Sequence, residues 1–300
     1  MHRQKRQATI LGGLTGLICA VLALAIQGSA SDSRAFTEEF HHTYELAAGG
    51  RVELDNINGA VHISAWDRNE VKVDAVKYAG RKERLDDAKI EVSANSGYIS
   101  IRTEYRHHDL NFSNDDSDNN PPSVEYTLTV PRTARLDEIK LINGALDVQG
   151  VNGEIRASCV NGRLQARDLG GRTKLSTVNG RLEADFTKLA ESPVELSSVN
   201  GSVVLTLPSD SKAELSASTV SGGIENDFGL HVNHHRYVGH DLRGQLAGGG
   251  TRIELRDVNG RIDIRHANDN RAMSPATDLS RDRDRDQDKD RDSDDDDDDI

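Results

Sequence analysis

The five-residue stretch Val160-Asn161-Gly162-Arg163-Leu164 recurs as Val178-Asn179-Gly180-Arg181-Leu182 and decides the fold. Each copy places a β-branched residue before Asn-Gly and an aliphatic residue two positions after the glycine. Copies of the same form begin at Ile57, Ile142, Val151, Val199 and Val258, and Val220-Ser221-Gly222-Gly223-Ile224 is a degenerate copy. Asn and Gly tolerate the backbone conformations of tight turns, whereas β-branched residues suit strands. The unit therefore predicts a corner between two short strands.

The spacing of the copies indicates how these strands are arranged. Asn143, Asn152 and Asn161 are nine residues apart, and the step from position 179 to 200 to 221 is 21 residues. Repetition at 18–21 residues is typical of a solenoid, in which no coil buries its apolar face alone. We therefore expect an all-β, right-handed β-solenoid resembling a β-helix. Asn161, Asn179 and Asn200 should stack as a hydrogen-bonded ladder along one corner.

A second all-β arrangement fits the same unit. Asn-Gly between alternating runs is also the strongest short signal for a β-hairpin, so nine-residue steps would build an antiparallel β-meander. The solenoid is favoured because one flanking pattern recurs at unequal steps. Aromatic residues make up only 4% of the chain, which predicts an aliphatic core. Val and Leu at equivalent positions of the repeat are expected to stack inside it.

The region before residue 130 has a different pattern and is expected to form a β-rich N-terminal cap. Apolar alternation predicts strands at 71–76, 89–92, 98–103 and 124–130. Residues 81–87 are the only stretch with the character of a helical turn. The polar segment 109–122 ends in Asn-Asn-Pro-Pro and predicts an exposed loop.

The first thirty residues have the order of a secretory signal peptide. Arg3, Lys5 and Arg6 precede an apolar run at residues 8–26, and small residues follow at 28–30. A 19-residue apolar run is also long enough to span a bilayer, so an uncleaved anchor at 8–26 is the alternative. Both interpretations place the rest of the chain outside the cytoplasm. Cleavage would leave Cys159 as the only cysteine, and its strand-like surroundings predict a small buried side chain.

The C-terminal end is expected to be a disordered tail over residues 271–300. Residues 281–300 contain twelve Asp and five Arg or Lys, and no aromatic residue. Such a segment cannot bury enough surface to offset its conformational entropy. Residues 31–270 are then a single solenoid domain. The net charge of −13 argues against nucleic acid as a partner, because binding phosphates requires a basic surface.

The order of several motifs resembles a known family. Gly49-Gly50, Ile57-Asn58-Gly59, Ala65-Trp66-Asp67 and Val130-Pro131 come before the serial Asn-Gly units. This order resembles the DUF4097 "putative adhesin" family of bacterial envelope proteins, with the related head GIN domains, over about residues 35–266. The resemblance implies a β-helix-like fold outside the cytoplasm and no established catalytic residues. The chain departs from the family pattern in its Asp-rich tail and at 230–250.

A search for chemistry yields no catalytic, cofactor-binding or metal-binding residue to assign. The chain has no Gly-x-Ser-x-Gly elbow, phosphate loop or His-Glu-x-x-His motif, so we expect neither an enzyme nor a cofactor. His231, His234, His235 and His240 are the densest imidazole cluster. Because Gly229, Gly239 and Gly244 flank them, a surface loop is expected, with metal binding as the alternative.

The expected function is therefore non-catalytic. The sequence predicts an extracytoplasmic, adhesin-like binding or scaffold protein that contacts an unidentified envelope or surface protein or a polysaccharide. It would touch the membrane only through an uncleaved N-terminal segment. The contact face would be the outward surface that bears Arg163, Arg167, Arg181, Glu183 and Arg261. An envelope-stress sensor acting by protein–protein contact is the first alternative, and a polysaccharide-active β-helix enzyme is the second.

Overall fold

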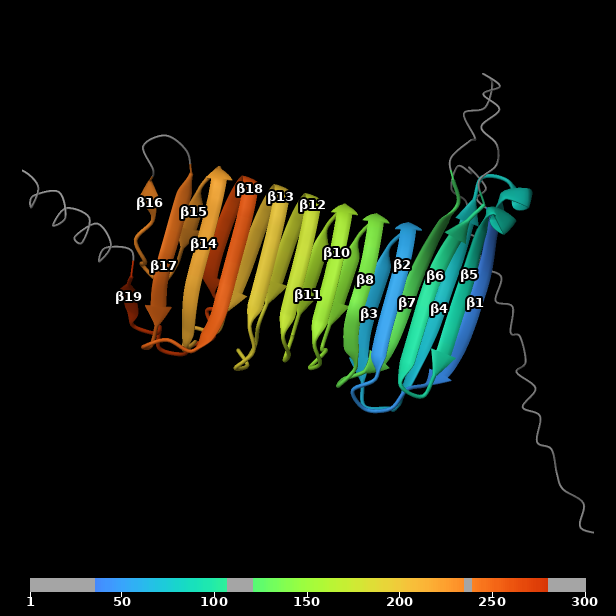
Figure 1. Cartoon of the computed structure of the whole chain (residues 1–300), viewed down its shortest axis with the longest axis horizontal. Helices are drawn as coiled ribbons and strands as arrows, with labels where there is room; N and C mark the ends of the chain where they lie inside the picture. The colour runs from blue at the N-terminus through green and yellow to red at the C-terminus, as the bar shows by residue number, and fades with distance from the viewer. Residues whose placement is uncertain (1–35, 107–120, 235–238, 280–300) are drawn as a thin grey trace, which may run out of the picture. The chain divides into compact units, whose positions relative to one another are not determined.

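The computed structural model describes residues 36–106, 121–234 and 239–279, and almost all of its ordered elements are strands. The short helix η1 (Lys82–Asp87) is the exception within this part of the chain. Strands of successive coils lie side by side in Figure 1. The predicted signal peptide or anchor and most of the predicted loop at 109–122 fall outside the described residues. No helix in the described part has the length and apolar character needed to cross a membrane.

The strands that precede the corners of the asparagine ladder form one side of the solenoid, which we call the upstream face. In spatial order it contains β5 (Ala88–Asn95), β6 (Tyr98–Tyr105), β2 (Arg51–Asn58), β8 (Arg135–Asn143), β10 (Ile155–Asn161), β12 (Thr173–Asp185), β13 (Val194–Leu207), β18 (Thr251–His266), β14 (Ala213–Ser221) and β17 (His240–Leu246). Two short strands, β16 (Asn233–His234) and β19 (Ala276–Asp278), pair with β17.

The strands that follow the corners form the opposite side, the downstream face. In spatial order it contains β1 (Phe36–Glu45), β4 (Glu70–Ala79), β7 (Ser123–Pro131), β3 (Val61–Trp66), β9 (Leu146–Gln149), β11 (Leu164–Arg167), the second halves of β12, β13 and β18, and β15 (Ile224–Asn226). Strands β12, β13 and β18 are long because they continue through the corner and belong to both faces.

Parallel pairing between successive coils confirms the β-solenoid and rules out the meander. For example, β10 pairs in parallel with β8 on one side and β12 on the other. The nine-residue step is half a coil, so Asn152 lies at the corner opposite Asn143 and Asn161. Antiparallel pairing is confined to the two ends, where β1, β4 and β5 form the predicted N-terminal cap and β17 closes the other end.

The coil order differs from the chain order at both ends. Near the N-terminus, the coil of β2 and β3 lies between β6–β7 and β8–β9. Near the C-terminus, β18 lies between β13 and β14, although it follows both in the chain. The 21-residue step from Val199 to Val220 suggests that these two units are neighbours. They are not, because β18 lies between them. Near each end of the stack, one coil is thus inserted between coils that are not both its neighbours in the chain.

The predicted asparagine ladder is confirmed and is longer than expected. Each side-chain Nδ2 donates to the Oδ1 of the asparagine in the preceding coil at 2.8–3.0 Å, through Asn58, Asn143, Asn161, Asn179, Asn200 and Asn259. The positive φ of the corner falls on the glycine rather than on the asparagine, as at Gly180 (φ +142°). A Cβ on Gly180 would lie 2.0 Å from the carbonyl oxygen of Gly162, so coils stack closely only because glycine is present.

The expectation that the valines of the repeat stack inside with the leucines is wrong for most of the valines that precede the corner. The β-branched residues directly before five of the ladder asparagines point outward and are 38–40% exposed at Ile142, Val160, Val178, Val199 and Val258. Val220, before Ser221 of the degenerate unit, is 52% exposed. Alternation explains this, because each is one residue from a buried position and successive strand residues face opposite sides. The aliphatic residue after the glycine does point inward, as at Leu164 and Leu182. Val151 is buried because it belongs to the opposite corner.

The core is aliphatic, as predicted, with one polar column. Cys159, Thr177, Ser198, Asp257 and Thr219 align across five coils, two residues before the corner, and all are buried. Burial raises the pKa of the Cys159 thiol and raises the pKa of Asp257 to about 6, an effect that the nearby amides of Val258 and Asn259 oppose. Asp257 is therefore a buried carboxyl group that keeps its proton to a higher pH than an exposed aspartate does.

Two predicted irregular segments contain strands. The glycine-flanked region around His240 forms β16 and β17, because the alternating residues of β17 bury Leu242 and Leu246 beside β14, so a loop over the whole region was wrong. Disorder from residue 271 was also wrong for 271–279. In that segment β19 pairs with β17 and Ser274 Oγ donates to the Ser211 carbonyl at 2.7 Å. The Asp-rich segment 280–300 lies outside the described residues.

Candidate functional site

Outward side chains at equivalent positions form columns across the coils, because the strands pair in register. Three such columns lie on the upstream face between the valine column and the opposite corner. The column three residues before the ladder asparagines has small side chains on β10, β12 and β13, namely Ser158, Ser176 and Ser197, and it continues to Lys140 on β8 and Arg256 on β18. The column two residues further back carries Arg156, Lys174 and Glu195. Because the short serine side chains stand beside longer charged ones, the surface is concave along the serine column.

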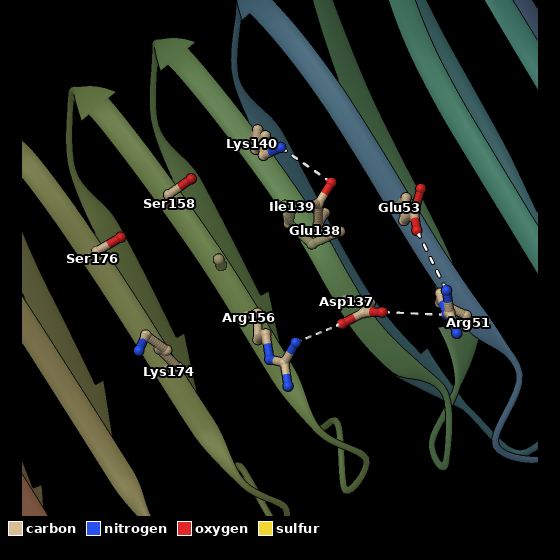
Figure 2. A pocket seen from close by; sticks show the side chains of 11 residues that line it. Arg51, Glu53, Asp137, Glu138, Ile139, Lys140, Arg156, Ser158, Lys174 and Ser176 are labelled. Atoms are coloured by element: carbon tan, nitrogen blue, oxygen red, sulfur yellow. Dashed lines mark hydrogen bonds and ion pairs between the residues drawn. The ribbon is translucent and has the colours of Figure 1, made fainter.

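The hollow is a shallow depression of about 500 Å³ across β2, β8, β10 and β12. Figure 2 shows Ser158 and Ser176 on adjacent strands, with Lys140, Arg156 and Lys174 around them. The hydroxyls of these two serines have no hydrogen-bond partner within the described part of the chain. The depression therefore offers free hydroxyls and charged groups, but no aromatic side chain of the kind that stacks on sugars.

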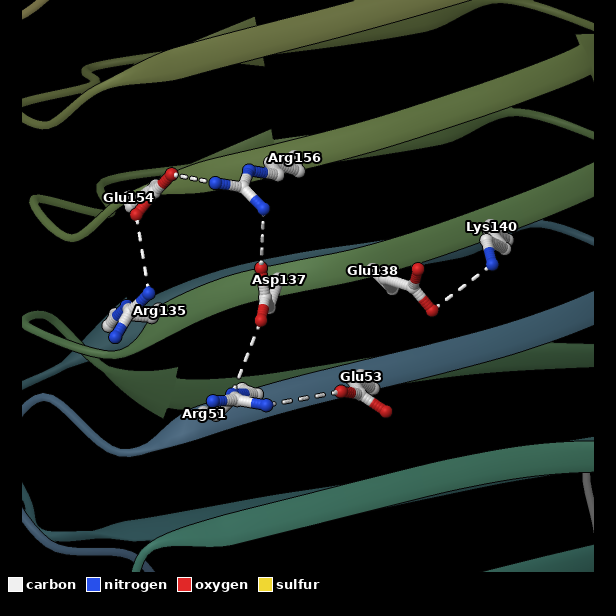
Figure 3. A network of polar contacts seen from close by, with 8 residues as sticks. All are labelled: Arg51, Glu53, Arg135, Asp137, Glu138, Lys140, Glu154 and Arg156. Atoms are coloured by element: carbon white, nitrogen blue, oxygen red, sulfur yellow. Dashed lines mark hydrogen bonds and ion pairs between the residues drawn. The ribbon is translucent and has the colours of Figure 1, made fainter.

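A β-bulge in β8 supplies the centre of the charge network shown in Figure 3. The register with β10 shifts between Leu136 and Ile139, so Asp137 and Glu138 together oppose Arg156. Asp137 accepts from Arg156 Nη1 at 3.3 Å and lies 3.2 Å from Arg51 Nε. The bulge thus lets one carboxylate link the coils on either side of β8.

Every carboxylate in this network has a cationic partner. Glu154 accepts from Arg156 at 2.8 Å and from Arg135 at 3.4 Å, whereas Glu138 accepts from Lys140 at 3.1 Å. Lys174 donates to Glu195 at 2.9 Å and thereby lowers the pKa of Glu195. A glycosidase needs one carboxylic acid to be protonated and a second carboxylate across a groove. The network instead has the character of a polar contact surface.

The five residues predicted to form a contact face all lie on the downstream face. Arg163, Arg181 and Arg261 share one outward column, in which Ser202 stands between Arg181 and Arg261, and Glu183 and Arg167 lie in the next two outward columns along the strands. The arginines are about half exposed. Their ion-pair partners are Asp147 for Arg163, Asp185 for Arg167, Glu183 for Arg181, and Glu225 and Asp263 for Arg261.

A second depression, of about 460 Å³, lies on the downstream face beside Arg163 and Arg167. Asp147 is one of its lining residues and lies 3.1 Å from His62 Nδ1 and 3.3 Å from Arg163 Nη2. The surroundings of Asp147 therefore combine an imidazole and a guanidinium from coils on either side of β9. The predicted contact face thus includes a hollow as well as an arginine column.

The upstream depression was not foreseen, although part of its signal is in the sequence. A serine stands three residues before the ladder asparagine in three successive units, at Ser158, Ser176 and Ser197. A small residue at a fixed repeat position predicts a continuous valley in any solenoid. The bulge at Asp137 carries no comparable signal, because an extra residue in one strand becomes visible only from its pairing.

The histidine cluster does not form a metal centre in the described residues. His234 and His240 come together on paired strands, with ring centroids 4.6 Å apart, whereas His235 is outside the described part. No group of three or more His, Cys, Asp or Glu side chains in the described ranges is placed to hold a metal ion. The two rings that do meet form a surface pair at the end of the stack.

The fold and its columns define a β-solenoid that presents shallow polar faces. The chain belongs to the Toastrack DUF4097 family, whose model matches residues 23–265. A "putative cell adhesion protein" from Clostridium sporogenes aligns with 77% of this chain and 100% of its own, at 13% identity and a TM-score of 0.43.

Two further solved structures share the same range. A "putative adhesin" from Bacteroides fragilis covers 76% of this chain and 97% of its own, at 12% identity and a TM-score of 0.34. A "putative lipid binding protein" from Parabacteroides distasonis covers 76% and 94%, at 9% identity and a TM-score of 0.31. The search of curated proteins found no match.

Proposed function

We propose that this chain is a non-catalytic, adhesin-like binding or scaffold protein of the bacterial cell envelope, acting outside the cytoplasm. Its downstream face would contact an envelope or surface partner. The observation that carries the proposal is the arginine column of Arg163, Arg181 and Arg261, which lie at one position on three of four neighbouring coils. Guanidinium groups repeated in this way suit an extended partner that bears carboxylate or phosphate groups, because each of the three coils adds an equivalent contact.

The location rests on separate grounds. The predicted signal peptide or anchor at residues 1–30 would direct the chain across the inner membrane. The resemblance to envelope adhesins agrees with that direction. The non-catalytic character is supported by the paired carboxylates of the upstream network and by the shallow form of both depressions.

The test combines localisation with binding. Cell fractionation of the tagged chain should place it in the envelope or the medium, and purified chain should bind isolated envelope fragments in a sedimentation assay. Replacing Arg163, Arg181 and Arg261 with Glu should lower that binding at least tenfold. A matched control replaces three exposed cations of the N-terminal cap, Arg68, Lys72 and Lys89, with Glu.

The control variant carries the same change of charge and should bind as the unmodified chain does. Cytoplasmic residence of the chain would contradict the proposal. Equal binding by the two triple variants would show that the downstream arginine column is not the contact.

A further inference from the structure

The upstream face has a charge pattern that reverses across a single line. Across β10, β12, β13 and β18 the outward column reads Arg156, Lys174, Glu195 and Glu254. The first two are cationic and the last two are anionic. The line that separates them runs between β12 and β13, parallel to the strands.

A second column of the same face repeats this reversal. Outward positions adjacent to the opposite corner carry Arg135 on β8 and Glu154 just before β10, and then Arg252 on β18 and Glu214 on β14. Arg172 and Pro193 stand between these two pairs, one on each side of the line. Relative to the same line, Glu154 and Arg252 are equidistant and opposite in charge. Arg135 and Glu214 are related in the same way. Both columns are therefore complementary to their own reversed copies.

The remaining columns are compatible with this symmetry over the three strands on either side of the line. The serine column pairs Ser176 with Ser197 and Ser158 with Arg256, and Lys140 comes opposite Ser218. Like charges meet only at the fourth strand out, where Asp55 on β2 comes opposite Asp241 on β17. The exposed valine column is apolar throughout, with Val178 opposite Val199 and, further out, Val160 opposite Val258. Six outward β-branched side chains in a row form an apolar strip that a monomer has no evident reason to expose.

We propose that the upstream face is the interface of a homodimer, formed by a second copy around a two-fold axis that runs between β12 and β13, parallel to the strands. A two-fold axis in this position keeps each column against itself and reverses the order of the coils. Arg156 then faces Glu254 of the partner subunit, and Lys174 faces the partner's Glu195. Val178 packs against the partner's Val199, as side chains do where two sheets pack face to face.

The charge pairing of Arg156 with Glu254 distinguishes the dimer from the isolated chain. Within one chain these residues are three strand spacings apart, about 14 Å, which is too far for an ion pair. Their partners within the chain are Asp137 and Glu154 for Arg156, and Arg256 for Glu254. Arg156 is 51% exposed, so its guanidinium has room for a further contact from outside.

The decisive experiment exchanges the two charges between chains. The full chain as isolated should sediment as a dimer, with a dissociation constant measured by sedimentation velocity over a dilution series. Arg156→Glu places two like-charge contacts in each homodimer and should weaken it at least tenfold, and Glu254→Arg should do the same. An equimolar mixture of the two variants restores both ion pairs and should recover the original constant within about threefold.

The matched control is Arg163→Glu on the downstream face. Arg163 has the same exposed fraction as Arg156 and also pairs with an aspartate, so its replacement should leave dimerisation unchanged. If a charge variant folds poorly, Val178→Lys tests the apolar column independently and should also weaken the dimer. A monomer at about 100 µM, or a dimer that none of the upstream changes weakens, would overturn the proposal. Failure of the mixture to recover would overturn the two-fold arrangement.

Discussion

The side-chain amide of Asn259 donates to Oδ1 of Asn200 at 3.0 Å, although 59 residues separate them in the chain. This bond continues the asparagine ladder from β13 to β18 and marks the coil that enters the stack out of chain order. Strand β18 pairs with β13 along its length and with β14 and β15 on its other side. The C-terminal end therefore cannot be completed by serial addition of coils, because β14 has no neighbour on that side until β18 is in place.

A first prediction concerns truncation. A chain that stops after Gly250 lacks β18 and should not unfold cooperatively, because β13 and β14 each lose a long parallel partner. A chain that stops after Leu279 keeps β18 and β19 and should retain the unfolding midpoint of the full chain. Circular dichroism during urea denaturation measures both. Cooperative unfolding of the shorter chain would show that the returning strand is dispensable.

A second prediction concerns the ladder itself. Asn179→Ala removes the bond that Asn179 donates to Asn161 and the bond that it accepts from Asn200. Loss of two hydrogen bonds at an exposed corner should lower the free energy of unfolding by about 1–2 kcal/mol. Asn152→Ala is the matched control, since Asn152 has the same sequence context but lies outside the ladder. The control should change stability by less than about 0.5 kcal/mol, and equal losses for the two variants would contradict the role of the ladder.

The asparagine ladder shows how far the sequence could lead. The Asn-Gly unit predicts corners, parallel coils and an aliphatic core because each depends on local pattern alone. It also predicts that Asn161, Asn179 and Asn200 stack, since a coil of 18–21 residues brings them into line. The unit cannot predict that position 221 pairs with Asn259 rather than with Asn200, because the order of coils depends on which exposed edges find each other.

The candidate site could likewise be predicted only in part from the sequence. Arg163, Arg181 and Arg261 were predicted to share a surface because they follow the glycine of the unit, and the structure places them in one column. The direction of the valines was predicted wrongly because an isolated apolar residue gives no indication of its face. Val160 becomes assignable only when its position is counted from buried Cys159 within the strand.

A third prediction follows from the close approach between coils at the corner glycines. Gly180→Ala would place a Cβ 2.0 Å from the Gly162 carbonyl oxygen. The φ of +142° at this position is one that residues other than glycine rarely adopt. The neighbouring atom is backbone and cannot move aside, so we expect a loss of at least about 3 kcal/mol. Gly223→Ala is the control, because a Cβ there meets nothing within 4 Å. Urea unfolding followed by the fluorescence of Trp66 compares them, and a mild effect at Gly180 would contradict the close stacking.

A fourth prediction concerns pH. Burial raises the pKa of Asp257 to about 6, well above the value of about 3.9 expected in the unfolded chain. Below pH 4 the carboxyl group is protonated in both states and imposes no cost. Between pH 4 and 6 the unfolded chain loses this proton while the folded chain keeps it, so the contribution of Asp257 to stability falls as pH rises. The loss is complete above pH 6 and amounts to at most about 3 kcal/mol.

The pH effect can be separated from those of other carboxylates by its sign. Cationic partners such as Lys174 lower the pKa of Glu195, so that group contributes stability that disappears as pH falls through the acid range. Asp257→Asn removes only the contribution of Asp257 to stability, which changes with pH in the opposite direction. The free energy of unfolding of this variant, minus that of the unmodified chain, should therefore rise between pH 4 and 6 and level off above it. Glu195→Gln should show no such rise, and a flat difference for Asp257→Asn would mean that Asp257 is ionised in the folded stack throughout this range.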